Sequence, residues 1–327
     1  MKAIVQDVYG PVDVLELRDI DRPVPGDDEV LVEVRAAGVD PSMWHLMTGR
    51  PYVARVALGL RRPKNPVRGW DGAGRVASVG AQVTGLKPGD EVFGTCEGAF
   101  AEYTRARADR LVLKPPNLTF EQAAALPVSG QTALQALRGT ARPQPGAKVL
   151  VIGASGGVGS FAVQLAAGVY GAEVTGVCGP RGADLVRSLG ATEVVDYTRE
   201  DVTERRTRYD VILDVAGNRP LPHLRRILAP RGTLVIAGGE GGGPWLGGLD
   251  RQLRAVLLSP FVRQNLRNLM SVSRREDLLV LRELAESGRI TPAVDRTYPL
   301  SEAADAVRHL TDGHPRGKLV VTVPPAA

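Results

Sequence analysis

Side chains that bind metals or form cross-links are scarce in this sequence. The 327 residues include two cysteines, Cys96 and Cys178, and four histidines. Two cysteines so far apart in sequence would pair only by chance of folding, and they cannot form a structural zinc site of the four-thiolate kind. The low cysteine content indicates a reducing compartment, and we expect a cytoplasmic protein.

Long apolar segments are also missing. No run approaches the ~20 residues that a membrane-spanning helix needs. The N-terminal segment has Asp7 where a signal peptide would need its apolar stretch. Hydrophobic residues make up 43% of the chain and charged residues 24%, which is typical of a globular protein. We therefore expect a soluble protein without domain-scale disorder.

The positive charge is modest and dispersed. The net charge of +5 comes mostly from arginines scattered along the chain. Such a distribution favours solubility and the binding of a phosphate-bearing cofactor over the concentrated basic surface of a nucleic-acid-binding protein. We expect no nucleic-acid partner.

The first third of the chain has the pattern of a β-rich unit. Residues 29–35 alternate polar and apolar side chains, as a half-buried strand does. Residues 87–92 combine a Pro-Gly-Asp turn with the start of another strand. Strands with such turns between them predict a closed or sandwich-like β unit.

The pattern changes after Thr119. Thr119 and Gln122 form a capping-box sequence ahead of an alanine-rich segment. Strands and helices then alternate, which predicts a parallel sheet covered by helices. The expected elements are 148–152, 161–167, 173–178, 184–189, 211–214 and 234–237. We place the change of domain between residues 125 and 126.

A return to the first domain is expected at residue 273. Ser273 and Glu276 form a second capping-box sequence, and Gly288 is placed to end the helix that follows. A last helix over residues 301–312 and a strand over 318–323 are expected after it.

The most specific local signal lies between residues 149 and 166. An apolar strand, Val149–Ile152, runs into a glycine-rich turn and then into a helix-forming segment. Glycines allow a close approach of the backbone to a pyrophosphate, and the helix N-terminus attracts negative charge. Ala154 replaces the first glycine of the dinucleotide fingerprint, while Gly156 and Gly159 keep its spacing. We expect Ser155, Gly156, Gly157 and Val158 to contact the cofactor; the alternative is a tight turn only.

The following strand indicates which dinucleotide is bound. NAD-selective sites place an acid at the end of that strand, ~20 residues on. Here Cys178, Gly179 and Arg181 occupy the region, and no acid precedes Asp184. Arg181 can pair with a 2′-phosphate, so we predict NADP(H). Arg181 as a solvated loop charge is the alternative.

Ordered motifs along nearly the whole chain carry a family resemblance. They include residues 36–41, 69–74, 87–92, 153–159, 189–191 and 317–321. The chain resembles the medium-chain dehydrogenase/reductase superfamily, in its zinc-free quinone-oxidoreductase-like branch. The resemblance implies an α/β fold: a GroES-like β-rich catalytic domain (1–125 and 273–327) and a Rossmann domain with a doubly wound parallel sheet (126–272). It also implies a homodimer, with cofactor and substrate meeting in the cleft between the domains.

The zinc positions of the superfamily are changed. Asp40 and Trp70 stand where zinc-containing alcohol dehydrogenases have a cysteine and a histidine ligand. Neither makes a sound tetrahedral site, so we expect no metal. Without a Lewis acid to polarise the oxygen, oxidation of an alcohol becomes harder, whereas reduction of an electron-poor conjugated acceptor requires less catalytic activation.

Three residues are candidates for the chemistry. By resemblance, Asp40 lies beside the nicotinamide ribose and substrate; a turn residue before Pro41 is the alternative. His45 lies near the ribose and suits proton relay, or it is a structural histidine. Tyr52 is one residue off the proton-donor tyrosine of similar enoyl reductases, or it lines a wall.

Further cofactor contacts follow from the resemblance. Thr132 matches a threonine near the nicotinamide half, and Tyr197 a tyrosine that closes over the 2′-phosphate end. Val215, Ala237 and Gly238 lie at strand ends, where family members offer backbone groups.

The function expected from this reading is hydride transfer from NADPH to a small hydrophobic quinone or α,β-unsaturated carbonyl compound. One alternative is a zinc-free alcohol or ketone reductase of the same fold. Another is a low-turnover NADPH-binding regulatory or membrane-associated protein. Residues 245–270 mix apolar residues and arginines, which suits a lid, a dimer element or weak peripheral membrane contact.

Overall fold

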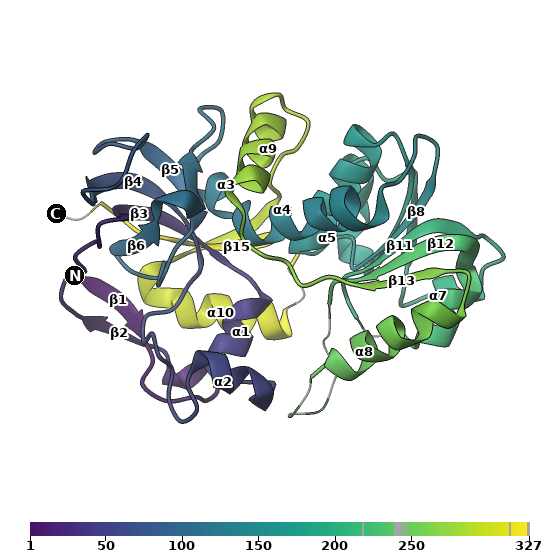
Figure 1. Cartoon of the computed structure of the whole chain (residues 1–327), viewed down its shortest axis with the longest axis horizontal. Coiled ribbons are helices and arrows are strands. Elements are labelled where there is room, and N and C mark those ends of the chain that lie inside the picture. The colour runs from purple at the N-terminus through teal and green to yellow at the C-terminus, as the bar shows by residue number, and fades with distance from the viewer. Residues whose placement is uncertain (218, 239–242, 244, 246, 314, 326–327) are drawn as a thin grey trace. The chain divides into compact units, whose positions relative to one another are not determined.

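The contacts between residues divide the molecule into two compact units (Figure 1). The computed structural model describes residues 1–217, 219–238, 243, 245, 247–313 and 315–325. Unit 1 comprises Met1–Gln131 and Ser273–Ala327, and unit 2 comprises Thr132–Val272. The sequence pattern places the first change of domain between residues 125 and 126, while the contacts place it inside helix α4 (Pro127–Leu134).

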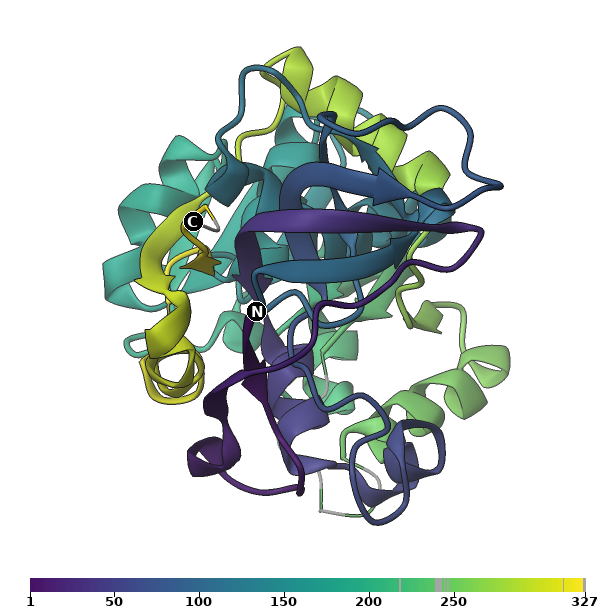
Figure 2. The ribbon, with the colours of Figure 1, turned by 90° about the vertical axis from the view of Figure 1, so that its left-hand side faces the viewer.

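Unit 1 is built on a seven-stranded sheet in the order β14-β15-β3-β4-β5-β7, with β6 paired to β3. Figure 2 turns this unit toward the viewer. Its strands are β3 (Glu29–Val39), β4 (Asp71–Val79), β5 (Glu91–Thr95), β6 (Tyr103–Arg107), β7 (Leu111–Leu113), β14 (Val294–Pro299) and β15 (Lys318–Thr322). A separate antiparallel pair joins β1 (Lys2–Val5) to β2 (Glu16–Asp19). This is the β-rich unit that the sequence predicts.

Short helices complete unit 1. They are α1 (Pro41–Thr48), α2 (Arg55–Leu58), α3 (Phe120–Ala124), α9 (Arg275–Glu286) and α10 (Ala303–Asp312). The capping box of Thr119 and Gln122 forms in full at the start of α3, as predicted.

The second predicted capping box is wrong. Helix α9 begins after Arg274, without a side-chain cap at that residue. The Ser273 hydroxyl lies 2.9 Å from Thr95 Oγ1 instead, so it is engaged by a residue distant in sequence. The far end of α9 agrees with the prediction, because Gly288 follows it with a φ of +70°.

Unit 2 contains a six-stranded parallel sheet in the order β10-β9-β8-β11-β12-β13. The strands are β8 (Lys148–Ile152), β9 (Glu173–Cys178), β10 (Glu193–Asp196), β11 (Tyr209–Asp214), β12 (Leu228–Ile236) and β13 (Asn265–Asn268). The helices are α5 (Gly157–Gln164), α6 (Ala183–Ser188), α7 (Leu221–Ile227) and α8 (Leu249–Leu258), with π-helical turns at Gln135–Ala141 and Leu165–Val169. Strands β9 and β10 follow outward on one side of the central β8–β11 pair, and β12 and β13 follow on the other side. This order confirms the predicted doubly wound Rossmann sheet.

Apolar runs account for the central strands of unit 2. Leu150, Ile152 and Ile212 are at most 1% exposed, because the sheet is covered on both faces. Each such side chain contributes roughly 1.5–3 kcal/mol by leaving water.

The segment 245–270 contributes α8 and the edge strand β13. Leu253, Leu257 and Phe261 on and after α8 are 59%, 61% and 85% exposed. Among the described residues, no helix is both long and apolar enough to cross a membrane.

Candidate active site

The carboxyl edge of the parallel sheet in unit 2 gathers the predicted cofactor-binding residues. Parallel strands end at one edge, so residues that follow different strands become neighbours there. The residues that end or follow strands at this edge are Ser155 after β8, Cys178 and Gly179 at β9, Tyr197 after β10, Val215 after β11, and Ala237 and Gly238 after β12. The edge includes the β8–β11 switch point, where open α/β sheets bind ligands.

The glycine turn after β8 is held tightly against the sheet. Gly153 has a φ of +87°, which favours glycine. The amides of Gly153 and Ala154 donate to the Val177 carbonyl at 3.0 and 2.9 Å. A Cβ on Gly159 would lie 2.0 Å from the Gly153 carbonyl oxygen. Glycine at 159 therefore allows α5 to pack directly on the turn.

The N-terminus of α5 suits a diphosphate. Gly156 is its N-cap residue, and the described side chains provide no capping hydrogen bond there. The amides of Gly157 and Val158 in the first turn lack intrahelical acceptors, and the helix dipole adds positive potential. A Cβ on Gly156 would have only the Gly153 carbonyl oxygen nearby, at 3.4 Å. The space beside this backbone is open to an anion, as a dinucleotide requires.

The end of β9 has no acid in the NAD position. Cys178 is buried, and burial raises the pKa of its thiol, with a further rise from Asp196 and an opposing effect of Arg187. The next residues form a 3-10 turn, Pro180–Gly182, in which Arg181 is exposed. A Cβ on Gly179 would lie 3.5 Å from the Tyr197 hydroxyl, so the tyrosine ring lies close to this turn.

The acids near this turn are engaged elsewhere. The Oδ1 atom of Asp196 accepts hydrogen bonds from the amide and the hydroxyl of Thr198, at 2.9 and 2.8 Å. Asp184 is solvent-exposed and pairs with Arg187 at 2.8 Å. Neither arrangement resembles a carboxylate held toward a ribose 2′-hydroxyl.

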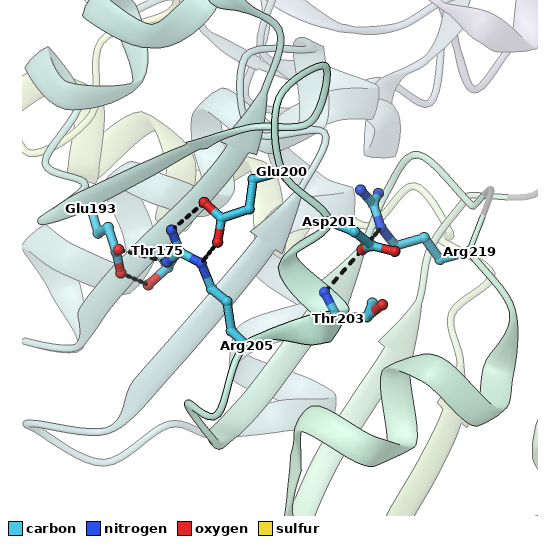
Figure 3. A network of polar contacts seen from close by, with 7 residues as sticks. All are labelled: Thr175, Glu193, Glu200, Asp201, Thr203, Arg205 and Arg219. Atoms are coloured by element: carbon cyan, nitrogen blue, oxygen red, sulfur yellow. Dashed lines mark hydrogen bonds and ion pairs between the residues drawn. The ribbon is translucent and has the colours of Figure 1, made fainter.

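An ion-pair network holds the segment that follows Tyr197 (Figure 3). The Arg205 guanidinium contacts Glu193 at 2.6 Å and Glu200 at 2.5 Å. Glu193 belongs to β10, and its Oε2 accepts a hydrogen bond from Thr175 of β9 at 3.4 Å. The network therefore ties the loop after β10 back to the amino end of that strand, beside β9.

The remaining predicted cofactor residues are mainly backbone or buried positions. A Cβ on Gly238 would lie 1.8 Å from the Val215 carbonyl oxygen, so the ends of β11 and β12 approach each other closely. The Ala237 amide donates to the Asp214 carbonyl at 3.0 Å. Thr132 lies on α4 and is 7% exposed.

In unit 1, Asp40 is the N-cap of α1. Its Oδ1 accepts a hydrogen bond from the Ser42 amide at 2.9 Å. The predicted turn role is therefore present as a helix cap. Its other oxygen, Oδ2, lies 3.9 Å from Lys318 Nζ, and no described group completes a hydrogen bond to it.

Lys318 joins Asp40 to a second carboxylate. Lys318 Nζ lies 3.5 Å from Asp71 Oδ2, and the three side chains are at most 3% exposed. Burial raises the pKa of Asp71 to about 8; Lys318 opposes the rise, Asp40 adds to it, and the Val128 amide lowers the pKa. Sequence reasoning did not select Lys318 or Asp71 as functional. Both residues fall within the family motifs at 69–74 and 317–321, and the local signal of a functional role was a lysine at the start of an apolar strand.

His45 and Tyr52 lie in neighbouring parts of one segment, in α1 and in the 3-10 turn that follows it. His45 Nδ1 lies 2.7 Å from the Arg50 carbonyl oxygen. A carbonyl only accepts, so Nδ1 carries the hydrogen and the neutral ring has its lone pair on Nε2. The Arg50 and Arg55 guanidinium carbons lie 5.9 and 4.7 Å from the Tyr52 ring centroid. Both predicted residues thus belong to one small segment with two cations.

In the part of the chain that the structure describes, no three His, Cys, Asp or Glu side chains gather as a metal site would need.

Two domain families match this chain. Residues 26–116 match the alcohol dehydrogenase GroES-like domain, and residues 189–321 match the family described as zinc-binding dehydrogenase. The chain is 35% identical over 335 residues to the chloroplastic NADPH-dependent alkenal/one oxidoreductase of Arabidopsis thaliana. That alignment covers 98% of this chain and 79% of the relative.

Solved structures agree over nearly the full length. The quinone oxidoreductase from Coxiella burnetii superposes with a TM-score of 0.87 at 30% identity, over 99% of each chain. A mycobacterial protein in complex with NADPH superposes with a TM-score of 0.82 at 25% identity, over 98% of this chain and 100% of that one.

Proposed function

The chain belongs to the medium-chain dehydrogenase/reductase superfamily, and on that premise we propose that it is an NADPH-dependent reductase of quinones or α,β-unsaturated carbonyl compounds. The observation that carries the proposal is the sheet edge of unit 2. There an uncapped helix N-terminus follows the glycine turn, and Arg181 occupies the strand end where an acid would select NAD. The printed activities of the relatives, alkenal/one and quinone oxidoreductases, support the acceptor class.

The residues at this edge have separate tasks. Gly157 and Val158 hold the diphosphate through backbone amides, while Gly156 leaves the space beside them open and Ser155 lies next to it. Arg181 and Tyr197 take the 2′-phosphate end, next to Cys178 and Gly179. Thr132, Val215, Ala237 and Gly238 line the nicotinamide half. The residue pattern fits NADP(H) because every group at the phosphate positions is neutral or cationic.

NADPH held by these residues would supply a hydride to the electrophilic carbon of the acceptor, and the displaced electron pair would move to the carbonyl oxygen. The chain must stabilise that oxygen and deliver a proton to it. His45 in its protonated form presents an Nε2–H, because Nδ1 is already committed to the Arg50 carbonyl. Tyr52 is the second candidate donor. Asp40, held by its capping bond, positions the start of α1.

We propose that the reaction needs no zinc. Asp40 and Trp70 occupy ligand positions of the zinc enzymes, and one oxygen of Asp40 is already used to cap α1. Conjugated acceptors are electrophilic enough to accept hydride when positioning alone lowers the barrier, by up to ~7–11 kcal/mol.

An acceptor screen tests the proposal. NADPH and NADH oxidation is measured with quinones, 2-alkenals and simple ketones. We expect turnover of the first two classes with NADPH preferred. Turnover of ketones alone would establish the alcohol/ketone reductase, and tight NADPH binding without oxidation would establish a low-turnover binding protein.

We also propose a cytoplasmic homodimer. The buried free thiols of Cys96 and Cys178 suit a reducing compartment. The exposed apolar side chains of α8, such as Leu253 and Leu257, offer a surface for a second copy. Sedimentation measures the oligomer. Cosedimentation with anionic vesicles by a monomer would point instead to peripheral membrane contact.

A further inference from the structure

Unit 1 contains a cavity of about 320 Å³. Its walls come from Tyr9, Leu46 of α1, Leu58 of α2, residues 63–65 and 67–70, and Cys96–Gly98. All of these residues belong to unit 1. At ~30 Å³ per water in the liquid, the volume corresponds to roughly ten water molecules, enough for a small acceptor.

Arg68 lines this cavity and is 3% exposed. Its backbone is fixed on both sides, since its amide donates to the Ile4 carbonyl at 3.1 Å and its carbonyl accepts from the Phe100 amide at 2.8 Å. Among the described residues the side chain has one hydrogen bond, a long one from Nε to the Pro66 carbonyl at 3.4 Å. Within the described part of the chain, no carboxylate pairs with it.

A guanidinium in this position needs an anion. It has five N–H donors, and a buried charge without a partner is strongly unfavourable. Burial lowers the pKa of Arg68 to about 10, with Tyr9 opposing the shift, so the group stays charged at neutral pH. The protein therefore keeps a cation beside an open cavity without neutralising it.

The other charged residues of the lining add to the positive electrostatic potential that Arg68 creates in the cavity. Lys64 and Arg110 also line it, and Glu97 is the one acid in the lining that the structure describes. Glu97 lies 4.0 Å from Arg105, outside the cavity lining. The lining is therefore net positive.

The cavity adjoins the candidate catalytic residues. The Arg55 guanidinium carbon lies 4.5 Å from the Tyr9 ring centroid and 4.7 Å from that of Tyr52. Leu46, in the cavity wall, follows His45 in α1. The Arg55 guanidinium therefore connects the Tyr9 ring of the cavity wall to the Tyr52 ring, and Leu46 connects the wall to α1.

We propose that Arg68 binds a carboxylate carried by the acceptor, and that the preferred acceptors are enones bearing that group. The inference rests on the proposed reductase function and specifies its substrate class. A planar guanidinium pairs with a carboxylate through two parallel hydrogen bonds. Among the described cations of the lining Arg68 alone is buried, since Lys64 is exposed and Arg110 is half-buried. The single charge of this buried group matches a carboxylate better than the nearly double charge of a phosphate monoester.

The test compares an acid with its ester. NADPH oxidation is measured with trans-4-oxo-2-pentenoate and with its methyl ester. We expect the wild-type kcat/KM to favour the acid at least tenfold. Arg68→Leu should bring the ratio of acid to ester close to one, through a higher KM for the acid, and Arg68→Lys should restore part of the preference. Arg61→Leu, at an exposed position outside the cavity lining, is the matched control.

Binding of the saturated product gives a readout that needs no turnover. Calorimetry with 4-oxopentanoate should show binding to the wild type that Arg68→Leu weakens at least tenfold. Folding of Arg68→Leu is checked by thermal unfolding, where removal of an unpaired buried charge should not lower the midpoint. Equal kcat/KM for acid and ester, or product binding independent of Arg68, would overturn the carboxylate site. Arg68-dependent binding without oxidation of NADPH by any acceptor would instead reject the reductase function.

Discussion

The buried cluster of Asp40, Lys318 and Asp71 allows a quantitative prediction for Lys318→Met. The substitution keeps the apolar stem of the side chain and removes the cation that lies beside two buried carboxylates. Breaking a buried ion pair from one side leaves an uncompensated charge, which typically costs about 3–5 kcal/mol. We expect a loss of that size in the free energy of unfolding at pH 8.5.

The loss should shrink as the pH falls. The folded-state pKa of Asp71 is about 8, above its ordinary value of 3.8. Between these values the folded chain holds a proton that the unfolded chain has released, so stability falls as the pH rises through this window. At pH 5.5 Asp71 is protonated and neutral in the folded chain, so removal of Lys318 leaves one fewer uncompensated negative charge than at pH 8.5. Asp71→Asn should remove the corresponding slope, at most about 1.4 kcal/mol per pH unit.

Urea unfolding followed by tryptophan fluorescence measures these effects. Trp44 and Trp70 belong to the unit that holds the cluster, and a Trp245→Phe background removes the signal of the other unit. Lys87→Met, at an exposed position, is the control. A Lys318→Met variant within ~0.5 kcal/mol of its parent at pH 8.5 would refute the reasoning, because surface changes lie in that range. So would a loss that stays the same at pH 5.5.

Three further predictions concern the cofactor and the proton. Arg181→Ala should weaken NADPH binding about 10–100-fold, the value of one charged hydrogen bond, and leave NADH binding within about twofold; equal losses in fluorescence titrations would remove Arg181 from its role. Gly159→Ala should destabilise the chain by about 1–3 kcal/mol in urea and weaken NADPH binding, because its Cβ would overlap the Gly153 carbonyl oxygen; unchanged values of both would contradict the tight packing of α5. His45→Gln should lower kcat about 100-fold with an unsaturated acceptor, whereas Tyr52→Phe should lower it less than threefold; the reverse order in steady-state assays would make Tyr52 the proton donor.

Local sequence patterns predicted helices and strands well where the structure of a segment depends on residues adjacent in sequence. The glycine turn after β8 and the strand–helix alternation of unit 2 are carried by residues adjacent in sequence, and the parallel sheet follows from them. The same kind of pattern failed at Ser273. Its sequence is as good a capping box as that of Thr119, but Thr95 engages its hydroxyl.

The charged cluster shows why part of the site could not be predicted. Strand pairing places Val320 and Asp71 on either side of Gly38 in the sheet, which brings the start of β15 and the start of β4 next to the end of β3. Asp40 follows β3 by one residue, so the three side chains meet only when this register forms. Nothing within the local sequence of any one of them signals the other two.

The sequence alone therefore determined the fold class, the glycine-rich turn after β8 and the absence of an acid at the end of β9, because each depends on residues close together along the chain. Tertiary structure decided which charges are buried and what they face: Lys318 lies between two carboxylates, and Arg68 lies beside a cavity with no described carboxylate paired to it. The physical reason is that desolvation depends on everything packed around a group, and those neighbours come from distant strands.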